Sequence, residues 1–472
     1  MNADHTSIVQ RIQRSEFIPG ILLILSIITY CIVFSYTTLM RHWSYYSTYF
    51  DLGCFEQGLW TTLHGSFFWN SPHDASQFGV HNSPILFLLI PVYYLFPHAE
   101  TLLILQTILL AAAAIPLFFI GGKYLGAWSG LAFSLIYLLY PALHGLNLFD
   151  FHEMAFLPLI LCTAMYYLLT HRMGRFVALS IVALMIKEDV SLLLIMITGY
   201  AIYARCYETE VQKKALCILI AIYAIWLIAS LAIVIPHFNP QGYLFTGRYI
   251  AEGGLSGMVN DNFPLKIVYL VLLFAPLGFT PLAAPEVLIT AVPSLAEILF
   301  QSIVAYRITT QYSALLIPVL FTSAILGTSR VVARLTAVKP GISRWVVPGL
   351  LALGLLSSIF CTPAPVSPFT LYYKFSPNSC QYVIDEHTTY LEEAIRLIPA
   401  DASVSAQNNL AGHLSQRNEI YLNYRPGVDN ILVDTKNSNV DWLGNSEIII
   451  PAHEYSTVYE RDGISLYAKR NR

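Results

Sequence analysis

The chain has 472 residues, of which 56% are hydrophobic and only 12% are charged, and its mean hydropathy is +0.58. This balance is typical of a polytopic membrane protein and excludes an ordinary soluble one. The formal net charge of −3 is too small to indicate nucleic acid or another strongly charged partner.

Charge is concentrated at one end of the chain. Residues 362–472 hold 22 Asp, Glu, Lys and Arg, whereas the much longer segment 1–361 holds 33. The sequence therefore predicts a transmembrane domain over 1–361 and a small soluble domain over 362–472.

Hydrophobic runs predict the transmembrane helices, because a bilayer core needs about 20 apolar residues per helix. We take the short run 176–186 as a crossing helix and the run 85–97 as a surface helix inside a long first outer loop, 40–98. The result is an all-α domain of about eleven transmembrane helices. They are predicted at 17–39, 99–121, 125–143, 154–170, 176–186, 190–205, 215–236, 265–281, 282–300, 311–328 and 345–361.

Basic residues orient this topology, because they concentrate on the cytoplasmic side of a membrane. Twelve face the cytoplasm on the eleven-helix assignment, against five outside. We therefore expect a multi-pass plasma-membrane protein with a cytoplasmic N-terminus and an extracytoplasmic C-terminal domain. The twelve are Arg11, Arg14, Lys123, Arg172, Arg175, Arg205, Lys213, Lys214, Arg330, Arg334, Lys339 and Arg344.

The run FDLGCFEQGLW, residues 50–60, places Asp51 and Glu56 among aromatic residues directly after the first predicted span. Burying a carboxylate costs free energy, whereas leaving it in water does not. Two carboxylates among aromatic residues beside a bilayer therefore suggest a functional site. The alternative is that Asp51 only caps a helix over 52–63, as Asp often does.

Further polar clusters fall on the same predicted face. Each alone has an ordinary explanation: a surface residue, or for the turn 187–189 a Lys–Glu pair with an Asp cap. Their convergence predicts a polar cavity that opens to the outside between helix ends. The residues are His81 in the first loop, Asp150, His152 and Glu153 between two predicted helices, Lys187, Glu188 and Asp189 in a turn, Arg248 in the loop 237–263, and Arg307 and Tyr312.

This pattern resembles the GT-C superfamily of integral-membrane glycosyltransferases, which use lipid-phosphate-linked sugars. The shared features are a long first outer loop with an early Asp, a surface helix in that loop, and an acidic outer turn between helices three and four. A closer resemblance is to a family of archaeal and bacterial predicted membrane proteins. Its phrases match FDLGCFEQGLW (50–60), HNSP (81–84), DFHE (150–153), KEDV (187–190) and QYSALLIP (311–318).

The resemblance implies transfer of a sugar from a polyprenyl-phosphate donor, in contact with membrane lipids, to a glycan, lipid or protein acceptor. It implies Asp51 as general base, Glu56 as a residue that orients the acceptor or helps to bind a metal, and Asp150 at the second acidic position. A divalent metal ion is an open question, with Asp51, Asp150 and His152 as candidate ligands. The expected substrate-binding residues are His81, His152, Glu153, Lys187, Glu188, Asp189, Arg248, Arg307 and Tyr312.

One departure from the family pattern concerns the phrase at 311–318. A His is expected there before the Tyr, but this chain has Gln311. No ligand role is therefore carried onto that position.

Residues 362–472 begin with a proline-rich link and then alternate between helical and strand patterns. An amphipathic helix is predicted over 386–398 and another helix near 408–416. Short strands are predicted at 402–406, 419–422, 430–434, 447–450 and 464–468, which indicates a small α/β domain.

Two other functions fit a polar outer cavity. A transporter or flippase of lipid-linked saccharides should also show inward-facing polar groups and inverted repeats, and we detect no repeat. A non-catalytic membrane scaffold would use the soluble domain to bind a partner.

Overall fold

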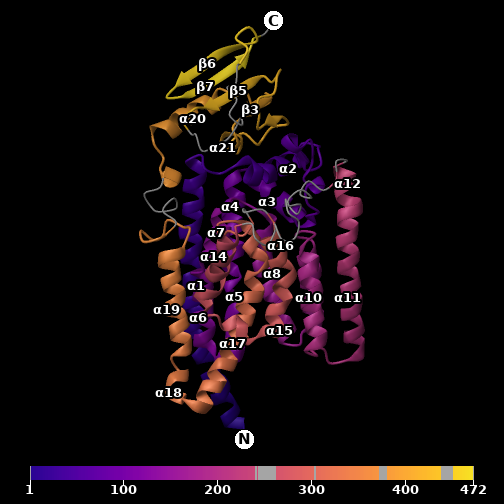
Figure 1. Ribbon diagram of the computed structural model, residues 1–472, viewed down its shortest axis with the longest axis vertical. Coiled ribbons are helices and arrows are strands. Elements are labelled where there is room, and N and C mark those ends of the chain that lie inside the picture. Colours follow the sequence, from indigo (N-terminus) through magenta and orange to yellow (C-terminus); the bar gives the residue numbers. More distant parts are fainter. Residues whose placement is uncertain are drawn as a thin grey trace.

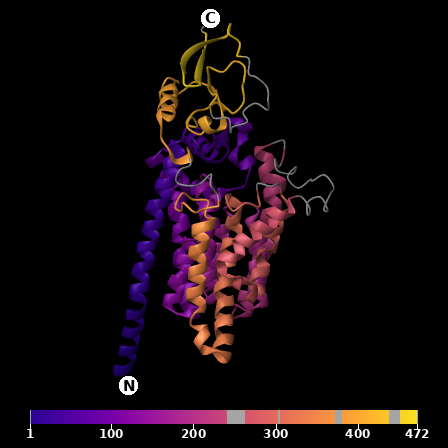
Figure 2. The same ribbon diagram turned by 60° about the vertical axis from the view of Figure 1, so that its left-hand side comes forward.

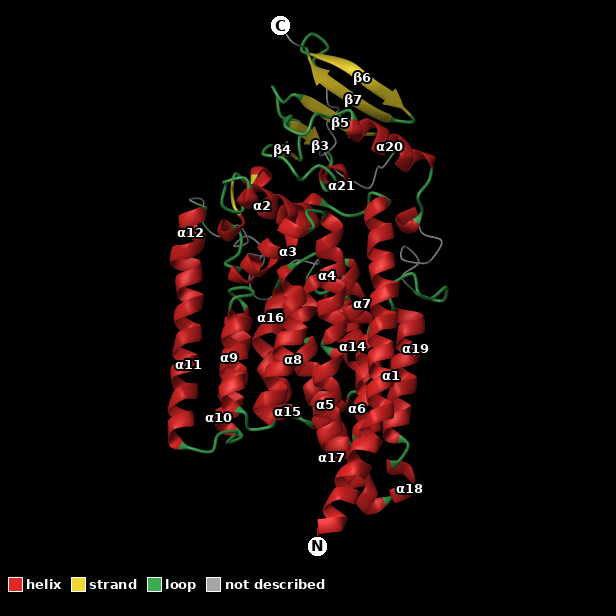
Figure 3. Ribbon diagram, turned by 180° about the vertical axis from the view of Figure 1, so that it is seen from behind, coloured by secondary structure: helices red, strands yellow, loops and turns green. Residues whose placement is uncertain are grey.

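The structure is a computed structural model, which describes residues 2–239, 242, 262–301, 305–371, 380–436 and 450–470, with side chains from residue 17 onward. A bundle of helices carries a small sheet-containing domain at one end, and the described N-terminal residues lie at the opposite end (Figure 1). The chain is therefore mostly helical, with its strands gathered towards the C-terminus (Figure 3).

The helices of the bundle follow the predicted hydrophobic runs. The first, α1 (Asn2–Trp43), runs the length of the bundle and ends beside the C-terminal domain (Figure 2). The others are α4 (Ala99–Ala112), α5 (Ala114–Leu125), α6 (Ala127–Leu138), α7 (Pro141–Leu148), α8 (Phe156–Leu169), α9 (Met173–Leu184), α10 (Val190–Tyr203), α11 (Glu210–Ala229), α12 (Ile235–Phe238), α14 (Phe263–Phe274), α15 (Pro285–Leu288), α16 (Val292–Phe300), α17 (Ile317–Val338), α18 (Pro340–Ser343) and α19 (Val346–Cys361).

Five helical segments of the described chain are long and apolar enough to cross a membrane. They are Phe17–Trp43, Ala99–Leu125, Glu210–Phe238, Ile317–Val338 and Pro340–Cys361. A sixth forms if α6 and α7, which are bent by 47°, are one span. The predicted count of eleven is not confirmed. Helices such as α8, α9 and α10 have only 12 to 14 residues, which is about 18–21 Å against a hydrocarbon core of about 30 Å.

The first loop folds into a cap over one end of the bundle. It contains a π-helical turn (Tyr49–Gly53), α2 (Cys54–Leu63), a short hairpin of β1 (Trp69–Asn70) and β2 (Ala75–Ser76), and α3 (Leu89–Leu95). The helix expected over 85–97 is thus present as a 3-10 turn (Pro84–Leu88) followed by α3. The helix expected over 52–63 begins at Cys54, and Gly53 precedes it. Asp51 therefore does not cap this helix, because it lies within the preceding π-helical turn.

The C-terminal domain has a five-stranded mixed sheet in the order β4-β3-β5-β7-β6. The strands β3, β4 and β5 are parallel, and β5, β7 and β6 are antiparallel. Four of the predicted strands are present, the strand predicted at 447–450 lies almost wholly outside the described residues, and β6 was not predicted. The elements are α20 (Glu386–Arg396), β3 (Val404–Ala406), α21 (Asn408–Ala411), β4 (Ile420–Tyr421), β5 (Asn430–Asp434), β6 (Tyr455–Arg461) and β7 (Ile464–Lys469).

The first loop and the C-terminal domain share one hydrophobic core. Tyr45 and Tyr49 of the loop pack in the same buried cluster as Leu391 of α20 and Leu410 of α21. Because these side chains are buried together, the C-terminal domain is packed onto the bundle (Figure 2).

Polar contacts between the loop and the C-terminal domain fix their register. The Ser71 hydroxyl donates to the carbonyl oxygen of Ile420 and accepts from its backbone N–H, at 2.8 and 2.9 Å. The Gln57 side chain donates to the carbonyl oxygen of Arg417 at 2.8 Å. These bonds pair backbone groups in and next to β4, which would otherwise be buried without a hydrogen-bond partner.

Glu56 lies at this junction. Its buried carboxylate accepts hydrogen bonds from Tyr93 at 3.2 Å, from the Gln416 amide at 2.8 Å and from the Ser415 hydroxyl. Burial raises the pKa of Glu56, although these hydrogen bonds oppose the rise. Glu56 therefore ties α2 to the segment that follows α21.

We expect the substitution Glu56→Ala to loosen the C-terminal domain. It leaves buried donors without an acceptor, a cost of about 3 kcal/mol. The measurement is limited proteolysis of the full-length protein in detergent, read at the link before α20. The control is Glu392→Ala, which removes an exposed acid that forms an ion pair with Arg396 on the same helix. Equal cleavage rates for the two variants would contradict this role.

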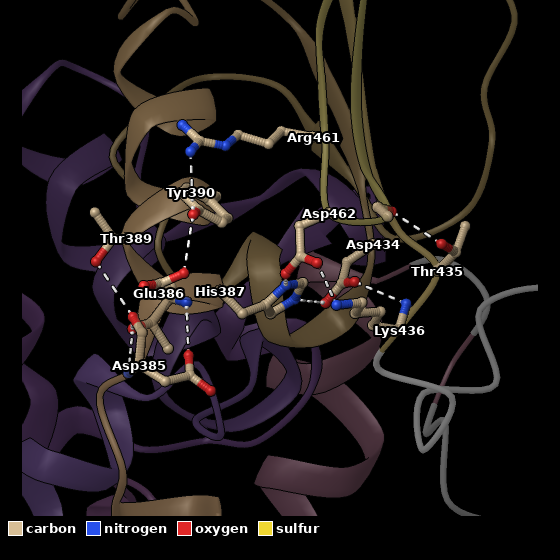
Figure 4. Close-up of polar contacts among 12 residues, drawn as sticks. Asp385, Glu386, His387, Thr389, Tyr390, Asp434, Thr435, Lys436, Arg461 and Asp462 are labelled. Atoms are coloured by element: carbon tan, nitrogen blue, oxygen red, sulfur yellow. Dashed lines mark hydrogen bonds and ion pairs between the residues drawn. The ribbon is translucent and has the colours of Figure 1, made fainter.

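An ion cluster joins α20 to β5 and to the turn between β6 and β7 (Figure 4). His387 places Nδ1 at 2.8 Å from Asp462 and Nε2 at 3.1 Å from Asp434, and Lys436 pairs with Asp462. Burial would lower the pKa of His387, but the hydrogen bonds and charges of the two aspartates outweigh it and raise the pKa. The protonated imidazole is therefore the form that the folded domain favours.

This cluster predicts a pH-dependent stability. Since the folded pKa of His387 is raised, its contribution is fully present below the unfolded value of about 6.5 and is lost as the pH rises through the folded value. The melting temperature of His387→Gln should therefore lie below wild type at about pH 6. The gap should narrow by about pH 8.5. The control is His453→Gln, at an exposed histidine of the same domain. A gap that is constant across this range would contradict the assignment.

Candidate functional site

A cavity of about 430 Å³, lined by both polar and apolar side chains, lies beneath the first loop. Its walls come from the π-helical turn, α2, the segment 73–81, the link between α7 and α8, the turn before α10, α16 and the segment 311–312. The lining residues are Phe50, Asp51, Cys54, Phe55, His73, Gln77, Val80, His81, Phe149, His152, Glu153, Met154, Lys187, Glu297, Gln301, Gln311 and Tyr312.

Asp51 and His152 form an acid–imidazole pair at this cavity. Nε2 of His152 lies 3.1 Å from Oδ1 of Asp51, and the Asp51 side chain is 25% exposed whereas His152 is 10% exposed. Burial would lower the pKa of His152, but the hydrogen bond to Asp51 and the charges of Asp51 and Glu153 raise it. A carboxylate that is accessible and has an imidazole beside it can accept a proton from a bound group.

Asp150 supports this pair from outside the cavity. Its buried carboxylate forms an ion pair with Arg41 and accepts a hydrogen bond from the backbone N–H of Thr48 at 2.9 Å. The Thr48 hydroxyl lies 3.1 Å from the Asp51 carboxylate and 3.3 Å from that of Asp150. Asp150 therefore holds the start of the turn that carries Asp51.

The link that carries Asp150 and His152 is itself held by α4. The Gln106 side chain donates to the carbonyl oxygen of Asp150 at 2.6 Å and accepts from the backbone N–H of His152 at 3.0 Å. Asp150 has a positive φ of 75°, a conformation that Asp tolerates better than most residues. This local geometry lets Asp150 and His152 face different neighbours although they are two residues apart.

The turn between α9 and α10 supplies a second supported histidine and a lysine. Glu188 accepts from His81 Nδ1 at 2.7 Å and from the backbone N–H of Asn82 at 3.0 Å, which fixes His81 against the cavity. Lys187 lines the cavity and pairs with Asp189 at 2.8 Å. In this turn, Lys187 lines the cavity, Glu188 holds His81, and Asp189 pairs with Lys187.

Three residues of the wall carry buried polar atoms for which the described chain offers no hydrogen-bond partner. These atoms are Nδ1 of His152, Oε2 of Glu153 and Oε1 of Gln311. Buried polar atoms are nearly always paired, so these three atoms are available to water or to a molecule in the cavity.

The structure brings together six of the predicted site residues at the cavity: Asp51, His81, His152, Glu153, Lys187 and Tyr312. Asp150, Glu188 and Asp189 lie behind it as supports, and Glu56 lies at the junction with the C-terminal domain. Arg248 lies outside the described residues.

Arg307 borders a different cavity. That cavity has a volume of about 220 Å³ and is lined by Arg41, Thr310 and Phe149 among others. Phe149 lines both cavities, so it stands between Arg307 and the Asp51 site. The backbone at Ile308, next to Arg307, passes close to α7 because Gly145 of α7 has no side chain. A Cβ atom at position 145 would lie 1.8 Å from the carbonyl oxygen of Ile308.

Sequence reasoning assigned no role to His73, Gln77, Glu297 and Gln301, which also line the cavity. Glu297 offered a signal, since an acid inside an apolar run is costly and often functional. Gln301 follows it by four residues and donates to it at 3.3 Å. Gln301 lies one residue beyond the helix predicted over 282–300, so no such signal marked it.

The candidate metal ligands do not form a ligand set in the described chain. No group of three His, Cys, Asp or Glu side chains there is arranged to hold a metal ion. Asp150 is turned towards Arg41 and Thr48, which leaves Asp51 and His152 as neighbours at the cavity.

Comparison with known proteins places the fold. ArnT from Cupriavidus metallidurans, solved in the apo state, is similar with a TM-score of 0.54 and 11% sequence identity. The similarity covers 94% of this chain and 97% of that one. A search of curated proteins gives no match. The profile of the family described as "Predicted membrane protein (DUF2079)" matches residues 41–466, and the chain belongs to this family.

Proposed function

We propose that the chain is a membrane glycosyltransferase of the GT-C type, which moves a sugar from a polyprenyl-phosphate donor to a cell-envelope acceptor. The observation that carries the proposal is the Asp51–His152 pair, set at a cavity whose wall has buried polar atoms without partners. The ArnT-like fold supports it, because ArnT is a GT-C glycosyltransferase.

In this proposal Asp51 is the general base. A hydroxyl or amide of the acceptor attacks the anomeric carbon, and its proton passes to the Asp51 carboxylate. The bond from the anomeric carbon to the phosphate oxygen breaks, and its electron pair leaves with the polyprenyl phosphate. The neighbouring imidazole of His152 holds Asp51 in position and offers a hydrogen-bond donor at the same place.

The sugar needs polar partners, and the departing phosphate needs positive charge. Glu153 and Gln311 supply acceptor atoms for sugar hydroxyls. Lys187 supplies a cation at the cavity wall, although its pairing with Asp189 reduces its net charge there. His81, held by Glu188, supplies a further hydrogen-bonding group.

The proposal places the reaction on the outer face of the membrane, under the C-terminal domain. The helix α2, which helps to line the cavity, lies at the end of the bundle that carries this domain (Figure 1). The basic residues of the sequence favour the opposite end as the cytoplasmic one. A lipid-linked donor can then present its head group from the bilayer while the acceptor enters from the aqueous side.

The direct test is Asp51→Asn, which keeps the size of the side chain and removes its basicity. Membranes with wild type or variant receive labelled polyprenyl-phosphate sugars, and transfer to envelope acceptors is followed. We expect the variant to lose at least about 100-fold in rate, the lower range for a general base.

The matched control is Asp401→Asn, at an exposed aspartate of the C-terminal domain, which should transfer like wild type. Equal melting temperatures for wild type and Asp51→Asn establish that the variant is folded. Transfer by Asp51→Asn at the wild-type rate would show that Asp51 is not the base. If wild type transfers none of the tested sugars, the result contradicts the proposal that the chain is a glycosyltransferase.

A further inference from the structure

Two adjoining cavities lie at the junction of α1, α4 and the C-terminal domain. One is a polar cavity of about 290 Å³, and the other is an apolar groove of about 640 Å³ on the surface of the bundle. His98 and Glu100 line both, so the two are continuous. The helix α2 contributes Phe55 to the Asp51 cavity and Glu56 to the polar cavity described here, so the two cavities are distinct.

The groove is built to contact hydrocarbon. Side chains at its floor and rim, such as Phe96 (62% exposed) and Ile108 (48% exposed), are open to the surroundings of the bundle. An exposed apolar face is expected wherever a helix meets lipid, so the groove alone indicates no specific ligand. Its other apolar side chains include Leu39, Trp43, Val92, Ile104 and Leu105.

The polar end distinguishes this groove from an ordinary lipid-facing surface. Glu56 and Glu100 both line the polar cavity, and the indole N–H of Trp43 donates to Glu100 at 3.1 Å where groove and cavity meet. Nε2 of His413 is buried here and has no hydrogen-bond partner among the described residues. A buried polar atom without a partner points to a ligand that the cavity takes.

The acceptor atoms of this cavity suit a group that carries N–H donors. Its one arginine, Arg417, donates to the carbonyl oxygens of Leu414 and Ala402, at 2.7 and 2.9 Å, so these donors are already used. Burial lowers the pKa of His413 well below the ordinary histidine value, so that its ring is neutral. Burial also raises the pKa of Glu56, whose carboxylate already accepts three hydrogen bonds, so Glu100 is the acid that offers an acceptor in this cavity.

We propose that this bipartite site binds a membrane phospholipid whose head group ends in a primary ammonium. The acyl chains lie in the groove along α1 and α4. The ammonium lies in the polar cavity and donates to Glu100 and to Nε2 of His413. Because walls of the polar cavity come from α1, α2 and residues 412–417, the bound lipid also joins the C-terminal domain to the bundle.

The head group distinguishes this phospholipid from phosphatidylcholine and phosphatidylglycerol. A primary ammonium offers three N–H donors, whereas the trimethylammonium of phosphatidylcholine offers none. Phosphatidylglycerol carries a negative charge without an ammonium and meets the carboxylates unfavourably. Binding of this phospholipid does not require that the protein transfers a sugar.

The test uses the full-length protein in nanodiscs of equal parts phosphatidylethanolamine, phosphatidylcholine and phosphatidylglycerol. After exchange into detergent, the retained lipids are counted by native mass spectrometry. We expect phosphatidylethanolamine to be retained about tenfold over each of the others, since charge-assisted hydrogen bonds of this kind favour the matched head group.

Two variants with matched controls locate the site. Glu100→Gln removes the charge and should abolish the preference, whereas Glu210→Gln, at an exposed acid of α11, should keep it. Ile104→Trp fills the groove and should reduce retention of phosphatidylethanolamine, whereas Ile225→Trp, on the exposed face of α11, should not. Equal retention of the three lipids by wild type, or an unchanged preference in both Glu100→Gln and Ile104→Trp, would overturn the proposal.

Discussion

The site depends on how the π-helical turn Tyr49–Gly53 is held. The turn carries Asp51, and its backbone N–H groups are held from two directions. Asp150, in the link between α7 and α8, accepts the N–H of Thr48. Asn408, at the start of α21, accepts those of Tyr49 and Phe50 with one oxygen, at 3.0 and 3.1 Å. The backbone that carries Asp51 is thus fixed by both the bundle and the C-terminal domain, as the role of general base that we propose for Asp51 requires.

Contacts with the first loop explain why the C-terminal domain packs at this end of the bundle. Glu56, Gln57 and Ser71 of the first loop all bond to residues 415–420, and Tyr45 and Tyr49 share a core with α20 and α21. The first loop covers the cavity, and the C-terminal domain packs on that loop. Polar side chains that would be costly in a bilayer are gathered there, where they can be paired with one another or with a ligand.

Sequence patterns predicted the class of fold, the short helix α9, the surface helix α3 and most strands of the C-terminal domain, because hydrophobic period and length carry this information. Of the residues predicted to share a cavity, Asp51, His81, His152, Glu153, Lys187 and Tyr312 line it, whereas Arg307 borders another cavity. Sequence patterns could not separate cavity-facing from supporting acids. Asp150 and His152 are two residues apart, and only the positive φ of Asp150 and its pairing with Arg41 decide which way each points. The position of Glu56 depends on contacts with residues some 360 positions later in the chain, and no local pattern reports such contacts.

We propose that the cavity at Asp51 and His152 receives the sugar-phosphate head group of a lipid-linked donor. A cryo-electron microscopy map of the protein in nanodiscs loaded with a polyprenyl-phosphate hexose would show this binding. We expect density for the head group within hydrogen-bonding distance of His152 and Glu153, with the lipid chain leading from the cavity to the bilayer. A donor bound with its head group at the opposite end of the bundle, away from the C-terminal domain, would contradict it.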